Sequence, residues 1–292
     1  MRNPQLISGG IYMVKAIFAC AALFLAAAPS PTFAAPPSAG TQSPQLSYVR
    51  SARGYSLVIA NDDGSGARTI YSSSRMINGD FGPDGMIYFW DGGRFNRMPA
   101  IGGSVEVLFD TNGQIPNHSD VSPNGASVAW FSVAGSTLYR YDLATRTQTP
   151  LAQVPYIISL TFDHTGNSII YAEEVSTVDY ELKVISAGGG TPSSLGLVGR
   201  ISQIDSARGD ATLALTFNPA GASAYISLWK PGMMTPVRIT DGYNPTYRCD
   251  DSAILFNRMT NSGPALYKRL SNGATTLMAK PSSIFSSYKP VC

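Results

Sequence analysis

One short pattern recurs along the chain at intervals of about 40 residues, and it constrains the fold more than any other feature. It first occurs as Phe81-Gly82-Pro83-Asp84-Gly85 and runs directly into an apolar segment at residues 86–90. Proline fixes φ, aspartate bonds the local backbone and glycine accepts positive φ, so the pattern predicts a tight turn between two strands. Related turns contain Gly125, 40 residues after Gly85, and Gly166, 41 residues after Gly125. The chain is therefore expected to repeat one strand-turn-strand unit.

Each unit contains four expected strands, and a period near 40 residues with four strands is typical of β-propeller blades. The content of 28 Gly and 20 Pro agrees with a fold rich in turns. The apolar residues that open the successive turns are Phe81, Val121, Phe162, Ile204, Tyr247 and Tyr288. Second strands are expected at 86–90, 127–132, 168–173, 212–217 and 253–258. Third strands are expected at 95–100, 137–143, 181–187, 224–230 and 265–270, and outer strands at 106–109, 148–152, 192–197, 236–240 and 275–280.

The two ends of the repeat region are incomplete, and they complement each other. The amino end supplies strands at 46–51, 55–61 and 67–71 but no inner strand, whereas residues 284–288 supply an inner strand with nothing after it. Pairing the two fragments closes a ring and leaves no open sheet edge. The sequence thus predicts an all-β, six-bladed β-propeller of four-stranded antiparallel blades, closed by a composite blade from the N- and C-terminal strands.

The first 45 residues lie outside this repeat. Lys15 precedes an apolar run at 16–28, and small residues follow, so residues 1–34 are predicted to be a signal peptide, with Met13 as an alternative translation start. Residues 35–45 are rich in Pro, Ser and Gly and are expected to form a flexible linker before the propeller at 46–292. We expect a periplasmic or secreted protein with no transmembrane anchor after cleavage.

Three cysteines are present, and two of them follow the signal peptide. Cys20 lies inside the apolar run rather than at its end, so an apolar packing role is preferred to a lipoprotein anchor. Cys249 and Cys292 each follow an inner strand on adjacent blades, which would place both near one rim. A disulfide between them is predicted, with two free thiols as the alternative.

Composition and motifs exclude several functions. The formal net charge is +2 and only 14% of residues are charged, so no basic face for nucleic acid is expected. The chain contains no Gly-x-Ser-x-Gly elbow and no phosphate-binding Gly-x-x-x-x-Gly-Lys loop. Glu173 and Glu174 are adjacent in an expected strand and would point to opposite faces, so they do not form an acid/base pair. No catalytic residue is assigned, and a monomer is expected.

The inner strands of a propeller line its axis, so the residue before each turn is a candidate for the channel wall. These residues are Asp80, Asp120, Thr161, Gln203, Thr246 and Ser287, with His118 close to Asp120 in sequence. They are predicted to line a binding channel. No cofactor and no metal ligand are assigned; a channel cation such as calcium, a basic group of a partner, or ordered water remain open as occupants.

The turn pattern resembles the TolB-type propeller repeat, together with the third-strand sequences Leu138-Tyr139-Arg140-Tyr141-Asp142-Leu143 and Ala265-Leu266-Tyr267-Lys268-Arg269-Leu270. The resemblance covers residues 46–292 and concerns the propeller alone, without the TolB N-terminal domain. It implies partner binding at a propeller face or channel mouth. We therefore expect an exported non-enzymatic scaffold that binds a protein or cell-envelope component. The alternatives are a glycan-active lyase or hydrolase using Asp80, Asp120 and His118, and a carbohydrate-binding module.

Overall fold

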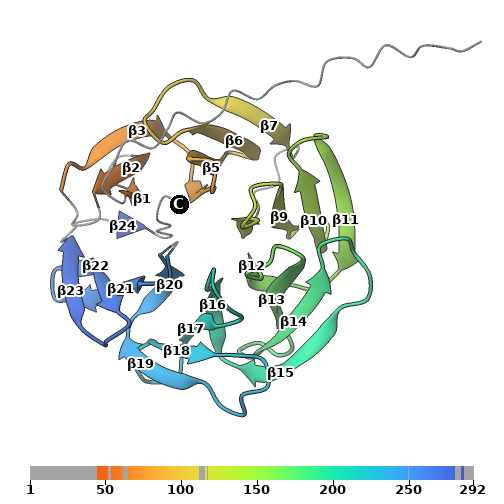
Figure 1. Ribbon diagram of the computed structural model, residues 1–292, viewed down its shortest axis with the longest axis vertical. Helices are drawn as coiled ribbons and strands as arrows, with labels where there is room; N and C mark the ends of the chain where they lie inside the picture. Colours follow the sequence, from red (N-terminus) through yellow and green to blue (C-terminus); the bar gives the residue numbers. More distant parts are fainter. Residues whose placement is uncertain are drawn as a thin grey trace, which may run out of the picture. The chain divides into compact units, whose positions relative to one another are not determined.

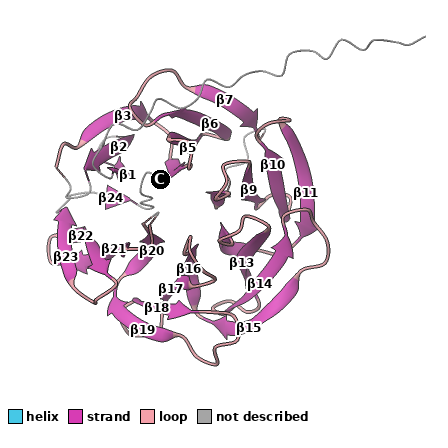
Figure 2. Cartoon of the chain, in the orientation of Figure 1, coloured by secondary structure: helices cyan, strands magenta, loops and turns pink. Residues whose placement is uncertain are grey.

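The computed structural model describes residues 45–51, 54–61, 65–111, 116, 118–248, 250–279 and 284–285. Within these residues all regular structure is β, and the strands form six four-stranded antiparallel sheets. The sheets stand around a common axis as the blades of a propeller (Figures 1 and 2). The predicted fold class is confirmed.

Five blades are continuous in sequence, and each runs from an inner to an outer strand. The first contains β4 (Ile77–Phe81), β5 (Met86–Asp91), β6 (Arg94–Pro99) and β7 (Glu106–Asp110), and the second contains β8 (Ser119–Val121), β9 (Ser127–Ser132), β10 (Thr137–Asp142) and β11 (Thr147–Gln153). The third contains β12 (Ile157–Phe162), β13 (Ser168–Glu174), β14 (Tyr180–Ser186) and β15 (Ser193–Gly199). The fourth contains β16 (Ile201–Ser206), β17 (Leu213–Phe217), β18 (Tyr225–Trp229) and β19 (Val237–Asp241), and the fifth contains β20 (Tyr243–Tyr247), β21 (Ala253–Thr260), β22 (Gly263–Leu270) and β23 (Thr275–Ala279).

The sixth blade is composite, as predicted. Its strand order is β24-β1-β2-β3, with β24 (Ile284–Phe285) from the carboxyl end and β1 (Gln45–Ser51), β2 (Tyr55–Asn61) and β3 (Arg68–Ser73) from the amino end. β24 pairs antiparallel with β1 through Val49 opposite Phe285 and Arg50 opposite Ile284. Residues from both ends of the propeller sequence therefore close one sheet.

The repeated turn has the backbone that its sequence predicts. Gly85, Gly125 and Gly166 have φ values of 74°, 66° and 74°, a region that glycine enters without strain. Asp84 accepts a hydrogen bond from the Met86 backbone N–H at 3.1 Å. Turns on neighbouring blades also touch, because a Cβ placed on Gly125 would lie 3.1 Å from Cγ of Pro83.

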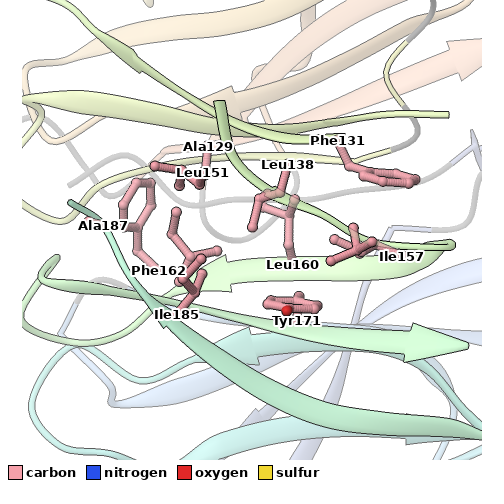
Figure 3. Packing of buried hydrophobic residues seen from close by; sticks show 12 residues of the cluster. Ala129, Phe131, Leu138, Leu151, Ile157, Leu160, Phe162, Tyr171, Ile185 and Ala187 are labelled. Atoms are coloured by element: carbon pink, nitrogen blue, oxygen red, sulfur yellow. The ribbon is translucent and has the colours of Figure 1, made fainter. Parts of the chain in front are cut away.

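The hydrophobic core is divided into wedges between adjacent blades. Figure 3 shows one wedge, in which Phe131 and Leu138 of the second blade face Ile157, Leu160 and Phe162 of the third. A smaller wedge joins the composite blade to the fifth; its residues are Val58, Ala60, Leu255, Leu266 and Met278. Burial between blades, rather than within a blade, therefore holds the ring together.

The fourth turn lies two residues later than the sequence spacing predicts. Ser206 pairs with Leu213 as Phe162 pairs with Ile169, so Ser206 and not Ile204 opens this turn. The third blade is longer than the second, because residues 187–192 join β14 to β15 whereas residues 143–146 join β10 to β11, so the period does not identify the position. The motif does not identify it either, because the turn has no glycine four residues after Ser206. The residue before the fourth turn is consequently Asp205, and Gln203 lies two residues upstream.

Candidate functional site

The inner strands enclose a cavity of about 230 Å³ on the propeller axis, called here the larger cavity. Residues of β4, β8, β12, β16 and β20 line it, together with Met76 and His118, which precede β4 and β8. Its polar lining includes Asn78, Asp80, His118, Gln203, Asp205 and Thr246. No Lys or Arg is among its described lining residues. Amide, hydroxyl, carboxylate and imidazole groups from five blades thus meet in one chamber.

A second and much smaller cavity of about 20 Å³ lies nearer the repeated turns. Asp120 and Thr161 line this smaller cavity, and Asp205 lines both. Asp80, His118, Gln203 and Thr246 line the larger one. Ser287, Cys249 and Cys292 lie outside the described residues, so the disulfide remains a prediction. The structure therefore distributes the candidate residues over two cavities and adds Asp205, which the sequence spacing missed.

Asp120 connects two blades through hydrogen bonds to backbone N–H groups. One carboxylate oxygen accepts from its own neighbour Val121 at 2.9 Å. The other accepts from the Phe162 N–H at 2.7 Å and from the Thr161 hydroxyl at 3.0 Å, both on the next blade. Asp120 is 5% exposed. The carboxylate therefore has an architectural role, and its two oxygens already accept three bonds.

Asp205 makes the same kind of link two blade junctions further along the ring. Its carboxylate accepts a hydrogen bond from the Tyr247 N–H at 2.7 Å, which joins the fourth and fifth blades. Between these two junctions, the Ser159 hydroxyl accepts from the Ile204 N–H at 3.1 Å. Polar inner-strand side chains thus satisfy backbone donors of the following blade, where the sheet itself offers no partner.

His118 is the one histidine in the wall of the larger cavity. Its backbone carbonyl accepts a hydrogen bond from the Phe131 N–H at 3.2 Å, which fixes this segment beside β9. Burial lowers the pKa of its side chain to about 4. At neutral pH the imidazole is uncharged, so it contributes one hydrogen-bond donor and one acceptor to the chamber.

Acidic residues elsewhere in the described segments do not gather into a metal site. Among the described residues, no three His, Cys, Asp or Glu side chains are close enough together to hold a metal ion. Glu173 is 8% exposed and accepts a hydrogen bond from the Lys183 ammonium at 2.8 Å. The Glu173 carboxylate is therefore engaged in an ion pair with Lys183, which leaves it unsuited to an acid/base pair with Glu174.

Apolar side chains are exposed on the propeller face where the inner strands begin, called here the entry face. Second strands end at this face, as the hydrogen bond from Glu174 N–H to the Tyr156 carbonyl at 3.0 Å illustrates. Five large apolar side chains from four blades are 42–64% exposed there: Met76, Val133, Val175, Val178 and Met259. Met76 also lines the larger cavity. The entry face therefore combines a polar chamber with apolar side chains on the surrounding blades.

No described segment forms a helix with the length and apolar character needed to cross a bilayer.

Comparison with known proteins gives a structural match only. No protein-family model matches the chain, and no curated protein does. TolB from Acinetobacter baumannii is similar with a TM-score of 0.74 at 17% sequence identity, covering 86% of this chain and 67% of that one. A chain of the nidogen/laminin complex gives 0.69 at 8% identity, covering 86% and 99%. A putative TolB from Agrobacterium tumefaciens gives 0.63 at 15%, covering 84% and 91%. The resemblance carried by the turn motifs is confirmed at the level of fold: the chain is a TolB-like six-bladed β-propeller.

Proposed function

We propose that this protein is an exported, non-enzymatic scaffold that binds a protein or another cell-envelope component at its entry face. The observation that carries the proposal is the set of five exposed apolar side chains on that face. Isolated exposed apolar residues are ordinary on protein surfaces, but several of them on one face, from different blades, favour an interaction site. The signal peptide predicted at residues 1–34 supports export.

The fold supports the proposal without naming the partner. Propellers present loops from every blade on one face, so a partner can contact several blades at once. One similar chain comes from a nidogen/laminin complex, which is an assembly of two proteins. In this protein the apolar residues come from the first, second, third and fifth blades. A partner seated there would therefore cover the mouth of the larger cavity.

The larger cavity supports a second candidate, a site for a small polar ligand such as a carbohydrate. The specific observation is its lining by Asn78, Gln203 and His118 together with two carboxylates. Side chains of these types recognise hydroxyl groups through paired donors and acceptors. Glycan turnover at Asp80, Asp120 and His118 would require substrate in both cavities, because Asp120 lines the smaller one.

The test is affinity capture from envelope extract with entry-face variants. Val175→Asp combined with Met259→Asp introduces charges at two exposed apolar positions, 50% and 64% exposed. Val237→Asp is the matched control, because Val237 is 54% exposed on the outer strand β19. A specific partner should be captured by wild type and the control and lost with the double variant. Equal capture by all three proteins rules out the entry face as the binding surface.

Glycan binding is tested separately by calorimetry with envelope oligosaccharides and the Gln203→Ala variant. Binding to wild type that weakens at least about tenfold in the variant would favour the carbohydrate candidate. Product formation in the same samples would show turnover and contradict a non-enzymatic role.

A further inference from the structure

A turn on the fourth blade contains two adjacent methionines that the proposed function does not use. It joins β18 to β19 and has the sequence Lys230-Pro231-Gly232-Met233-Met234. The Met233 N–H donates to the Lys230 carbonyl at 3.0 Å, and Gly232 has a φ of 90°. Proline followed by glycine with positive φ is the pattern of a type II turn. The methionines are therefore held by a defined turn rather than by a loose loop.

Met233 holds the end of β18 through two further contacts. Its carbonyl accepts a hydrogen bond from the Trp229 indole N–H at 3.0 Å. Its sulfur lies 3.2 Å from the Lys230 backbone N–H and accepts from it. Trp229 is 1% exposed and packs in the wedge between the third and fourth blades. One thioether thus participates in the contacts that position a core tryptophan.

Both methionines are exposed to solvent, to different degrees. Met234 is 97% exposed and Met233 is 37% exposed. Met98 and Met278 are 1% and 9% exposed and provide buried references in the same chain. Oxidation of methionine follows the exposure of its sulfur, and the sulfoxide is polar where the thioether was apolar.

We propose that Met233 and Met234 form an oxidant-responsive site for hydroperoxides, in which oxidation of Met233 opens the turn that supports Trp229. A sulfur lone pair attacks one peroxide oxygen, the S–O bond forms and the O–O bond breaks. With hydrogen peroxide, hydroxide leaves and takes the proton of the sulfur-bound oxygen, giving sulfoxide and water; an organic hydroperoxide releases the corresponding alcohol instead. The sulfur is oxidised by two electrons and the peroxide is reduced by two. A thiol-dependent methionine sulfoxide reductase would reverse the change.

The two methionines have different parts in this site. Met234 makes no hydrogen bond through its sulfur among the described contacts and is the first to meet the oxidant. Oxidation of Met233 converts its sulfur from a soft acceptor to a tetrahedral centre that carries a strongly solvated oxygen. The contact to the Lys230 N–H is then lost, and the turn is free to exchange.

The experiment treats the full-length protein with hydrogen peroxide and follows each methionine by peptide mapping. Met234 should oxidise faster than Met233, and both should oxidise at least about tenfold faster than Met98 and Met278. Hydrogen exchange of the Lys230 and Met233 amides should then rise about five- to tenfold when Met233 is oxidised.

Two leucine variants separate the roles, since leucine has similar volume and no sulfur. Met233→Leu should raise amide exchange of the turn before any peroxide is added, with no further rise afterwards. Met234→Leu should behave as wild type before and after treatment. An unchanged turn in protein with fully oxidised Met233 overturns the proposal. Oxidation of Met98 in step with Met233 also overturns it, because the oxidant would then be acting on unfolded chain.

Discussion

Replacing Asp120 with alanine is expected to destabilise the propeller by about 3 to 5 kcal/mol, because one carboxylate joins the second and third blades. The substitution removes the acceptor of the Phe162 N–H at 2.7 Å and of the Thr161 hydroxyl at 3.0 Å. It also removes the acceptor of the Val121 N–H at 2.9 Å. Asp120 is 5% exposed, so water has little access to replace it.

The magnitude follows from the groups left behind. A buried donor that loses its acceptor costs about 1 to 3 kcal/mol, and two backbone donors and a hydroxyl are affected. The three groups together would cost about 3 to 9 kcal/mol. Burial of the carboxylate itself carries a cost that the substitution removes, which places the estimate in the lower part of that range. For a domain of this size, each kcal/mol corresponds to about 2 to 4 °C in melting temperature, so a decrease of about 10 °C is expected.

The assay is urea denaturation of three proteins followed by circular dichroism. Asp120→Ala is compared with wild type and with Asp110→Ala, whose carboxylate lies 3.4 Å from Arg94 with its side chain 49% exposed. An exposed ion pair of that kind contributes less than about 1 kcal/mol. If Asp120→Ala costs no more than the Asp110 control, the inter-blade carboxylate does not stabilise the ring and the reasoning is refuted.

Three further predictions concern pH and the turns. Burial lowers the pKa of His118 from 6.5 to about 4, so between these pH values the unfolded chain binds a proton that the folded chain does not. The free energy of unfolding should therefore fall by up to about 3 kcal/mol as the pH is lowered through this range. His118→Gln should remove this pH dependence in urea titrations at several pH values. Gly85→Ala meets no atom within 4 Å and should cost about 1 kcal/mol for its φ alone. Gly125→Ala also meets Pro83 at 3.1 Å and should melt lower; equal melting temperatures of the two variants would show that the added methyl group does not clash with the neighbouring turn. Asp251 has a φ of 53° and accepts two backbone N–H groups of the fourth blade, so Asp251→Gly should lose about 1 to 3 kcal/mol in calorimetry despite relief of the backbone, and a gain would contradict this account.

The propeller could be predicted because its repeat is written in local chemistry. Turn residues and alternating apolar residues report the structure of their own segment, and β9 (Ser127–Ser132) has the predicted bounds. The fourth copy failed for a local reason as well: the longer connection at residues 187–192 lengthens the third blade, and the turn that Ser206 opens has no glycine four residues later. Counting at a fixed period cannot detect residues that are added to a connection.

The candidate site was only partly accessible to the same reasoning. The sequence places Asp120 near the axis, but its bond to Phe162 depends on how two blades sit against each other. Asp205 was missed because the fourth turn lies two residues later than a fixed period predicts. Four of the five exposed residues of the entry face, such as Val175, lie in loops of unequal length, and periodicity carries no information about them.

The composite blade has a consequence for the order of folding. β1 finds its inner neighbour only when β24, more than 230 residues later in the chain, is present. A chain that emerges from its amino end therefore keeps one edge of β1 unpaired until almost the whole sequence has followed, and such edges recruit other chains. Closure is a contact of very high sequence separation, which makes it slow. The interval before closure is the period in which this protein is most exposed to aggregation, and protection by a chaperone is most valuable then.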